Sequence, residues 1–254
     1  MSTDPFVIHS FETKEQTTQE AGKIITQILQ DFLQQPILLL ASGGSALDIF
    51  KYIHFPERAD TLTLSVVDER YSSDPLVNNF AQLAALDFFQ PFMVSGGKSI
   101  DTRLAGEESL LDVANRFEWA LRQWKRDNAL GKVVVILGMG SDGHTSGVMP
   151  YPEDPQVFGE LFDDTALWVV GYDAGVKNRY PLRITTTLSF LREAVDVALV
   201  FVVGEEKQTM FEKFLTTDDV LCAMPIQIVK KMRQSVIVTD RRVLIAQKRD
   251  VSIV

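Results

Sequence analysis

The stretch from Val133 to Ser146 most constrains what this chain can fold into. It opens with a run of β-branched and other apolar residues, Val133–Leu137, which is too short for a buried helix and stops abruptly at glycine. Such a run is typical of a strand buried on both faces of a parallel sheet. Three glycines within six positions then let the backbone turn sharply and approach a ligand closely. Asp142 and His144 lie in this turn, at the carboxyl end of the expected strand, where open α/β sheets bind ligands.

Composition limits the class of protein and its partners. The 254 residues fit one large α/β domain as well as two small ones, and a hydrophobic fraction of 46% supplies ample core. A net charge of -9 disfavours nucleic acid or an anionic membrane as the main partner, so an anionic small substrate would need a local basic pocket. The single cysteine, Cys222, cannot form an internal disulfide. Because no signal or membrane-spanning pattern is found, we expect a cytoplasmic globular protein.

Apolar runs and helical periodicities alternate along the chain. The strands that we expect are residues 6–11 (a short edge strand), 37–41, 61–67, 133–137, 166–171, 195–203 (the longest run, and therefore central) and 235–239 (the last). The helices that we expect are residues 13–32, 46–53, 79–88 with Asn78 as cap, 105–128, 205–214 and 225–232, with a loop at 91–98. This order predicts a single α/β domain over residues 1–254, with a doubly wound, mostly parallel, Rossmann-like sheet and helices on both faces.

Polar groups follow four of the expected strands, at Ser42–Ser45, Asp68–Arg70, Asp142–His144 and Gly204–Lys207. Taken singly, a charged strand end is usually a solvated terminus, and Ser-Gly-Gly-Ser is ordinary loop chemistry. In a parallel sheet, however, all four ends lie on the same edge. Their convergence favours a binding site over a merely solvated rim.

His144 is the residue best placed for chemistry. A lone histidine is often structural, but this one follows a buried strand in a glycine-rich turn beside Asp142, and it can titrate near neutral pH as a general base toward water. His9 and His54 have no such setting, and we interpret them as surface or packing residues. Asp68 together with Asp142 and His144 offers metal-ligand types, but the spacings of strong metal sites are absent. No dinucleotide-binding or P-loop motif is present either.

At these residues the chain resembles a known family. The shared segments occur in the family's order: Ser42-Gly43-Gly44-Ser45, Asp68-Glu69-Arg70, Gly138–Thr145, Arg183-Ile184-Thr185 and Gly204-x-x-Lys207. Together they resemble the 6-phosphogluconolactonase family, within the glucosamine-6-phosphate isomerase/deaminase superfamily, from about Ile37 to Asp240 by element order. The Gly-Met-Gly-x-Asp-Gly-His-Thr stretch is the most specific of these motifs.

The resemblance implies hydrolysis of 6-phospho-D-glucono-1,5-lactone to 6-phosphogluconate, the second step of the oxidative pentose phosphate pathway. It implies no cofactor and a small sugar phosphate as the only necessary partner. His144 would activate water, and Asp142 or Asp68 would orient His144 or a sugar hydroxyl. The residues that would hold the phosphate are Ser42, Gly43, Gly44, Ser45, Arg70, Arg183 and Lys207.

The chain departs from the family pattern in three places. Ala46-Leu47 stands where the family has Thr-Pro, and Ser146-Gly147 stands where it has Ala-Ser. The segment before Arg183 is unusually basic, which makes Lys177 and Arg179 further candidates for contact with the phosphate.

Two other functions stay open at this point. Glucosamine-6-phosphate deaminases resemble this chain too, with the counterpart of Asp68 as carbon-acid base, but they have Tyr or Phe at the position of Arg70 and a glutamate before the proline, where Met149 precedes Pro150 here. A non-catalytic sugar-phosphate sensor would carry a DNA-binding segment, yet the residues before the first core strand are not basic. An enzyme of this family that has lost its activity is a further non-catalytic alternative. The oligomeric state, monomer or small homo-oligomer, is also open.

Overall fold

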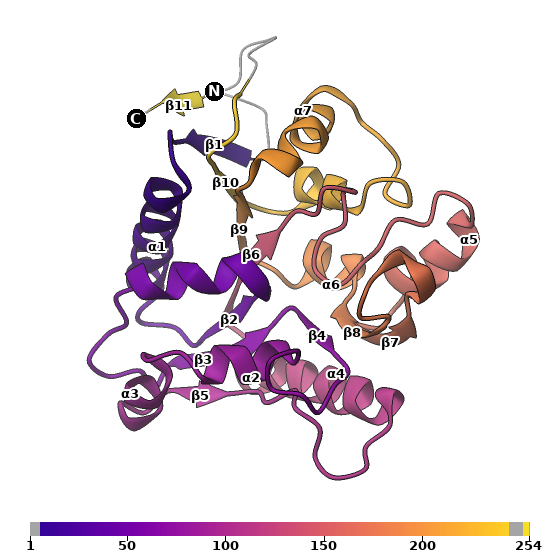
Figure 1. Cartoon of the computed structure of the whole chain (residues 1–254). Coiled ribbons are helices and arrows are strands. Elements are labelled where there is room, and N and C mark those ends of the chain that lie inside the picture. The colour runs from indigo at the N-terminus through magenta and orange to yellow at the C-terminus, as the bar shows by residue number, and fades with distance from the viewer. Residues whose placement is uncertain (1–5, 244–250, 254) are drawn as a thin grey trace.

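The structure is a computed structural model that describes residues 6–243 and 251–253. Its centre is an eight-stranded sheet in the order β11-β1-β10-β9-β6-β2-β3-β5, and every pair in it is parallel (Figure 1). The strands are β1 (Phe6–Ser10), β2 (Ile37–Ala41), β3 (Leu62–Val66), β5 (Lys98–Ser99), β6 (Lys132–Gly138), β9 (Val197–Val202), β10 (Ser235–Thr239) and β11 (Val251–Ile253). The predicted fold class, a doubly wound α/β sheet, is therefore confirmed.

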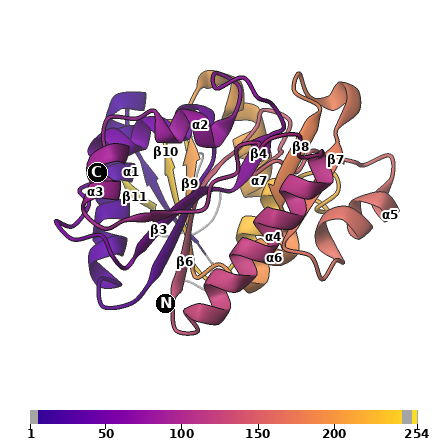
Figure 2. The same cartoon turned by 90° about the horizontal axis from the view of Figure 1, so that it is seen from below.

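Helices cover both faces of this sheet (Figure 2). One face carries α1 (Lys14–Asp31), the 3-10 helix η1 (Gly44–Tyr52), α2 (Asn79–Ala84) and α3 (Phe89–Val94). The other face carries α4 (Leu110–Asp127), α6 (Leu188–Glu193), α7 (Gln208–Thr216) and the 3-10 helix η5 (Pro225–Lys231). Shorter helical pieces are α5 (Pro155–Phe158), η2 (Gly159–Asp163), η3 (Gly175–Lys177) and η4 (Glu205–Lys207). Among the described residues, no helix is long and apolar enough to cross a membrane.

The apolar runs of the central strands serve both faces at once. Successive side chains of a strand point to opposite sides, so Val133, Val135 and Leu137 pack into the cluster under α4, whereas Val134 and Ile136 pack into the cluster under α1. All five are almost fully buried. This two-sided burial explains why β6 is a continuous apolar run rather than an alternating one.

A second, antiparallel sheet lies beside the first and was not predicted. It has three strands in the order β4-β8-β7, namely β4 (Asp68–Arg70), β8 (Leu182–Thr186) and β7 (Val169–Asp173). Helix α4 packs against both β7 and β8 and so connects the two sheets (Figure 2). The strand expected at residues 166–171 thus belongs to this sheet and not to the parallel one. Asp68-Glu69-Arg70 is not a solvated terminus, because it pairs with β8 and its first two residues are buried.

Several element boundaries also differ from those predicted. The helix expected from residue 105 begins at Leu110, because the Ser109 hydroxyl accepts the backbone N–H of Asp112 at 3.2 Å and the Asp112 carboxylate caps Ser109 in return. Residues 91–94 extend helix α3 where a loop was expected. The predicted edge strand, β1, lies between β10 and β11, so β10 is not the last strand of the chain either.

Candidate active site

A pocket of 210 Å³ opens at the carboxyl ends of the parallel strands. Residues from all four predicted strand ends line it, together with Arg183 of β8 and Asn79 of α2. The full lining is Ser42, Gly43, Ser45, Ala46, Asp68, Arg70, Asn79, Gly138, Met139, Gly140, His144, Ser146, Arg183 and Lys207. Of the catalytic and phosphate-binding residues predicted from the motifs, Asp142 and Gly44 do not line the pocket itself.

His144 and Asp142 form a pair at the rim of this pocket. His144 Nδ1 lies 2.6 Å from Asp142 Oδ1, and the same oxygen accepts the backbone N–H of His144 at 3.1 Å. Burial alone would raise the pKa of the Asp142 carboxyl, but the contacts with His144 outweigh it and lower that pKa below its ordinary value. An ionised Asp142 holds the proton of the imidazole on Nδ1, which leaves Nε2 as a proton acceptor.

The glycine-rich turn between β6 and His144 makes this pair possible. A Cβ on Gly140 would lie 2.1 Å from His144 Nδ1 and 2.4 Å from Asp142 Oδ1, so only glycine fits there. Gly143 has a positive φ of 88°, and its carbonyl accepts the N–H of Ile226 at 3.0 Å. Thr145 Oγ1 donates to the carbonyl of Gly138 at 2.8 Å and closes the turn onto the strand. The backbone conformation of this turn therefore sets the geometry of the His144–Asp142 pair.

Asp68 and Arg183 form a buried ion pair at the floor of the pocket, through Asp68 Oδ2 and Arg183 Nη2. Their side chains are 5% and 6% exposed, so water screens this pair little. The register of β4 and β8 places Asp68 opposite Thr185 and Arg70 opposite Arg183, so Asp68 and Arg183 are diagonal neighbours on the same face of the sheet. Arg183 Nε is buried without a hydrogen-bond partner among the described residues. Asp68 is thus not the carboxylate that contacts His144.

Arg70 brings a positive charge that no carboxylate neutralises within the described part of the chain. Its Nη1 donates to the Val77 carbonyl at 3.4 Å, and its Nε is buried without a partner there. Its Cζ lies 4.8 Å from the ring centroid of Tyr180. Arg70 therefore differs from Arg183, whose charge is already paired.

Lys207 adds a second cation to the pocket lining. It ends η4, directly after β9 and Gly204, whose φ of 109° redirects the chain at the strand end. Burial lowers the pKa of the Lys207 ammonium, while the nearby Glu206 and Asp240 act in the opposite direction. Together with Arg70 it gives this pocket a local positive charge within a chain of net charge -9.

Asn79 is a lining residue that the sequence interpretation missed, and Glu69, which the sequence showed only as part of the Asp68-Glu69-Arg70 motif, supports it from behind the pocket. Asn79 Nδ2 donates to the Asp68 carbonyl at 2.9 Å, and its buried Oδ1 lies so near the loop after β2 that a Cβ on Gly43 would be 2.3 Å from it. Glu69 accepts the backbone N–H groups of Asn79 and Phe80 at 2.5 and 2.9 Å. The only sequence signal for Asn79 was the Asn-Asn pair at the start of a helix, which predicted the Asn78 cap correctly and nothing more.

Ser146 occupies a strained position that coincides with a departure from the family pattern. It is a non-glycine residue with a positive φ, 52°, and it is buried. Its hydroxyl lies 3.0 Å from Thr185 Oγ1 and 3.2 Å from Thr186 Oγ1. These hydrogen bonds attach the segment after His144 to β8, and so connect the glycine-rich turn to the second sheet.

The two further basic candidates lie outside the pocket lining. Lys177 Nζ forms an ion pair with Glu153 and lies 4.4 Å from the ring centroid of Tyr151. Arg179 is exposed, and its Cζ lies 5.3 Å from the ring centroid of Tyr180. Neither residue lines the pocket, and their predicted contact with a phosphate stays a prediction.

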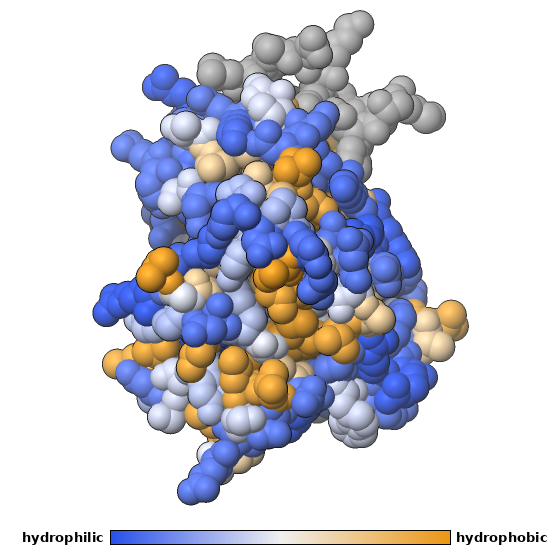
Figure 3. All heavy atoms as spheres, turned by 90° about the vertical axis from the view of Figure 1, so that its right-hand side faces the viewer, coloured by the Kyte–Doolittle hydropathy of each residue, from blue (hydrophilic) through white to orange (hydrophobic). Residues whose placement is uncertain are grey.

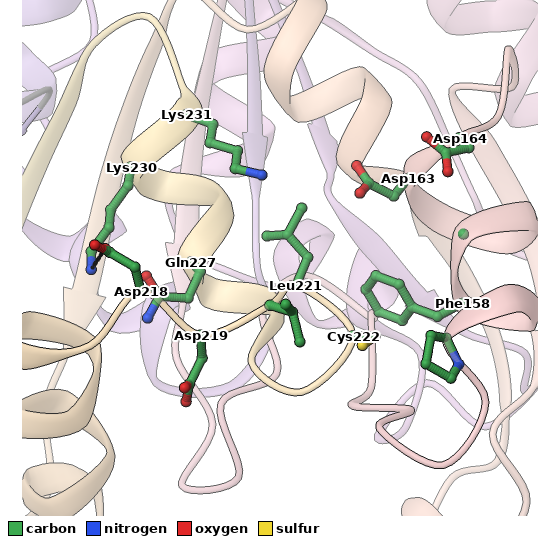
Figure 4. Close-up of a pocket in the computed structure, with 13 residues that line it drawn as sticks. Phe158, Asp163, Asp164, Asp218, Asp219, Leu221, Cys222, Gln227, Lys230 and Lys231 are labelled. Atoms are coloured by element: carbon green, nitrogen blue, oxygen red, sulfur yellow. Dashed lines mark hydrogen bonds and ion pairs between the residues drawn. The ribbon is translucent and has the colours of Figure 1, made fainter.

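A larger pocket of 470 Å³ lies on the side of the molecule that carries α5 (Figure 4). This side shows apolar residues amid a largely hydrophilic surface (Figure 3). Most of the pocket's carboxylates are already paired, Asp163 with Arg192 at 2.6 Å, Asp218 with Lys230 at 3.0 Å and Asp219 with Lys213 at 2.7 Å. The described residues that line it include no histidine and no glycine-rich strand end. Despite its size it lacks the reactive groups that the smaller pocket combines.

The smaller pocket has the composition expected of an α/β protein that acts on an anionic small molecule, because it sets an imidazole–carboxylate pair beside unneutralised cations. Residues 12–238 match the family described as glucosamine-6-phosphate isomerases/6-phosphogluconolactonase, and the chain belongs to that family. A 6-phosphogluconolactonase of Mesorhizobium japonicum is 30% identical over 201 residues, which are 76% of this chain and 77% of that protein. One of Neisseria meningitidis serogroup A is 25% identical over 221 residues, which are 82% and 87% of the two chains.

Solved structures share the fold over nearly the whole chain. The 6-phosphogluconolactonase from Shewanella baltica superposes with a TM-score of 0.73 at 21% identity, covering 92% of this chain and 96% of the other. The enzyme of the same name from Trypanosoma brucei gives 0.72 at 17% identity, covering 93% and 97%. These structures confirm the fold, and the match of residues 12–238 to the family confirms the family expected from the motifs.

Proposed function

We propose that this chain is a 6-phosphogluconolactonase, which hydrolyses 6-phospho-D-glucono-1,5-lactone to 6-phosphogluconate in the oxidative pentose phosphate pathway. The observation that supports this most strongly is the His144–Asp142 contact of 2.6 Å in the same pocket as the unpaired Arg70. The pocket therefore offers a general base and an anion-binding group to the same small ligand. The curated relatives named above carry this activity in their names.

The proposed reaction uses His144 as the general base. A lactone is an activated ester, so attack by water on its carbonyl carbon needs a base and a stabilised oxyanion rather than a cofactor. With the Nδ1 proton directed to Asp142, Nε2 takes a proton from the attacking water as the new C–O bond forms. When the tetrahedral intermediate collapses, the ring C–O bond breaks and the same proton passes to the departing ring oxygen. Asp142 stabilises the transient imidazolium.

The phosphate would be held by the cations and the glycine-rich loop of the same pocket. Arg70 and Lys207 supply positive charge, and Gly43, Gly44 and Ser45 supply backbone N–H groups at the start of η1. Gly44 contributes through its backbone, since its positive φ of 67° shapes the turn while a Cβ there would meet nothing within 4 Å. Binding the remote phosphate fixes the carbonyl against His144, which is positional catalysis.

The isomerase–deaminase alternative within the family is less well supported. That chemistry needs a free aspartate as carbon-acid base, whereas Asp68 is buried in an ion pair with Arg183. It also needs a second acid for ring opening, and Asp68 is the only carboxylate in the lining as far as the chain is described. Arg70 in addition occupies the position where deaminases have an aromatic residue.

Two parallel assays test this choice. In the first, 6-phosphogluconolactone is generated in situ and acid release is followed above the spontaneous background. In the second, ammonia release from glucosamine 6-phosphate is followed with the same protein. We expect acceleration in the first assay only. Ammonia release without lactone hydrolysis would overturn the proposal in favour of the deaminase, and binding of 6-phosphogluconate without either activity would indicate a sensor.

A further inference from the structure

The guanidinium of Arg70 lies over an aromatic ring that is not part of the pocket lining. Its Cζ is 4.8 Å from the ring centroid of Tyr180, within the range of a cation–π interaction. Tyr180 is half-buried and belongs to the turn that leads into β8. The ring therefore contacts the pocket's unpaired cation from outside the space that a substrate would fill.

The turn holds Tyr180 in a fixed relation to the strand that carries Arg70. The side chain of Asn178 accepts the backbone N–H of Tyr180 at 2.9 Å, and the carbonyl of Pro181 accepts the N–H of Ala174 at 2.8 Å. Immediately afterwards the chain enters β8, where Arg183 pairs in register with Arg70. Tyr180 and Arg70 are thus attached to two neighbouring strands of one sheet.

An aromatic neighbour can orient the Arg70 side chain without neutralising its charge, which a carboxylate could not do. Arg183 is oriented by Asp68, but that contact also neutralises its charge. The Arg70 guanidinium has only the Val77 carbonyl at 3.4 Å as a hydrogen-bond acceptor among the described residues. The face of an aromatic ring restricts the rotamers of an arginine side chain. The full charge of the guanidinium, and the N–H groups in the guanidinium plane, stay available to an anion.

We propose that Tyr180 is a positioning residue that holds Arg70 for the phosphate group of the substrate. The inference rests on the proposed function, since it concerns the same pocket, and it adds a residue that the motifs of the family do not include. Tyr180 acts through Arg70 and not on the reacting carbonyl. Its loss should therefore weaken capture of phosphorylated ligands and leave the chemical step largely unchanged.

The test compares Tyr180→Leu with Tyr180→Phe and with Val176→Ala, an exposed substitution in the same turn. Tyr180→Leu should raise KM for 6-phosphogluconolactone about 3- to 30-fold with little change in kcat, whereas Tyr180→Phe keeps the ring and should stay within about twofold of wild type. Val176→Ala should behave as wild type. Unchanged KM in Tyr180→Leu, or an equal loss in Tyr180→Phe, would overturn the inference.

Two controls separate this role from general damage and from failure of the proposed function. Hydrolysis of unphosphorylated glucono-1,5-lactone should be the same in wild type and Tyr180→Leu, and Tyr180→Leu should cost nothing further in an Arg70→Ala background. If the wild type hydrolyses neither lactone, calorimetry with 6-phosphogluconate decides instead. A 3- to 30-fold weaker Kd in Tyr180→Leu would then keep the inference without the enzyme activity. Equal affinities, or no binding by the wild type, would overturn it.

Discussion

His144 and Asp142 are two positions apart in the sequence, and the backbone turn between them sets their chemistry. Asp142 Oδ1 contacts both Nδ1 and the backbone N–H of His144, so one carboxylate oxygen holds both the ring and the backbone of this residue. The sequence placed both residues after a buried strand but left open whether Asp142 or Asp68 stands beside the imidazole. The difference depends on strand pairing, since β8 supplies Arg183 to Asp68, and the sequence did not predict that pairing.

Replacing Asp142 by asparagine tests the pairing. An amide at this position can present an N–H to Nδ1, which favours the tautomer with the proton on Nε2 and removes the base. We expect Asp142→Asn to lower kcat for lactone hydrolysis on the order of 100-fold, with KM little changed. Steady-state kinetics at pH 7 with Ser141→Ala as an exposed neighbouring control would measure this. An unchanged kcat would refute the role of Asp142.

Gly140→Ala tests whether the glycine shapes the site. Its Cβ would lie 2.1 Å from His144 Nδ1, so the ring would have to move, and a displacement of about 1 Å at a reacting group can cost on the order of 100-fold in rate. Gly138→Ala is a steric control, since a Cβ there would meet no atom within 4 Å. We expect a far larger loss of kcat from Gly140→Ala, with both variants folded by circular dichroism. Similar losses in the two would contradict this account.

At the scale of elements, β4 is a short strand that organises several parts of the pocket. Glu69 at its centre is fully buried and accepts N–H groups from Asn79 and Phe80 of α2, as well as the Thr102 hydroxyl at 2.8 Å. Burial raises the pKa of Glu69 to about 7, although these hydrogen bonds act in the opposite direction. The carboxyl thereby fastens α2, and with it Asn79, to the strand that carries Asp68 and Arg70.

The raised pKa of Glu69 makes a pH-dependent contribution to stability. Between its unfolded value of 4.5 and about 7, the folded state binds a proton that the unfolded state has released, so raising the pH lowers the free energy of unfolding by about 3 kcal/mol over this window. Urea unfolding from pH 4.5 to 8 should show this decline in the wild type. It should be missing in Glu69→Gln and retained in the exposed control Glu107→Gln. The same decline in all three proteins would refute the assignment.

Helix α4 connects the two sheets, and Phe117 on its buried face is fully enclosed. Removing its ring would leave a cavity that the surrounding strands cannot fill. We expect Phe117→Ala to lower the free energy of unfolding by about 3–5 kcal/mol, against at most about 0.5 kcal/mol for Trp119→Ala, which is exposed on the same helix. Chemical denaturation would measure both. Equal effects would show that α4 does not unite the sheets in the way described.

The parallel strands could be predicted from the sequence because burial on both faces leaves continuous apolar runs, as in β2, β6 and β9. The antiparallel sheet could not be predicted. Its strand β4 has three residues and all of them are charged, so its local sequence suggests a solvated terminus. Only pairing with β8, more than one hundred residues later in the chain, makes β4 a strand. Such long-range pairing leaves no local pattern.

For the whole molecule, the sequence predicts that a parallel sheet brings distant strand ends to one edge. The structure agrees, because Ser42, Asp68, His144 and Lys207 line one pocket. The contributions of Asn79 and Tyr180 could not be anticipated, since each depends on side-chain contacts between elements. The catalytic and binding roles of these residues, and the single domain over residues 1–254, stay predictions. An acidic chain with one basic cleft is consistent with a small anionic substrate.

The most direct test of the central claim is acid release from 6-phosphogluconolactone by wild type and His144→Gln at the same protein concentration. We predict clear acceleration over the spontaneous rate by the wild type and a loss of at least about 100-fold in His144→Gln. Binding of 6-phosphogluconate, measured by calorimetry, should be nearly equal in the two proteins, because Arg70 and Lys207 are untouched. Wild-type activity in His144→Gln would contradict the assignment of the base, and no acceleration by the wild type would contradict the proposed function.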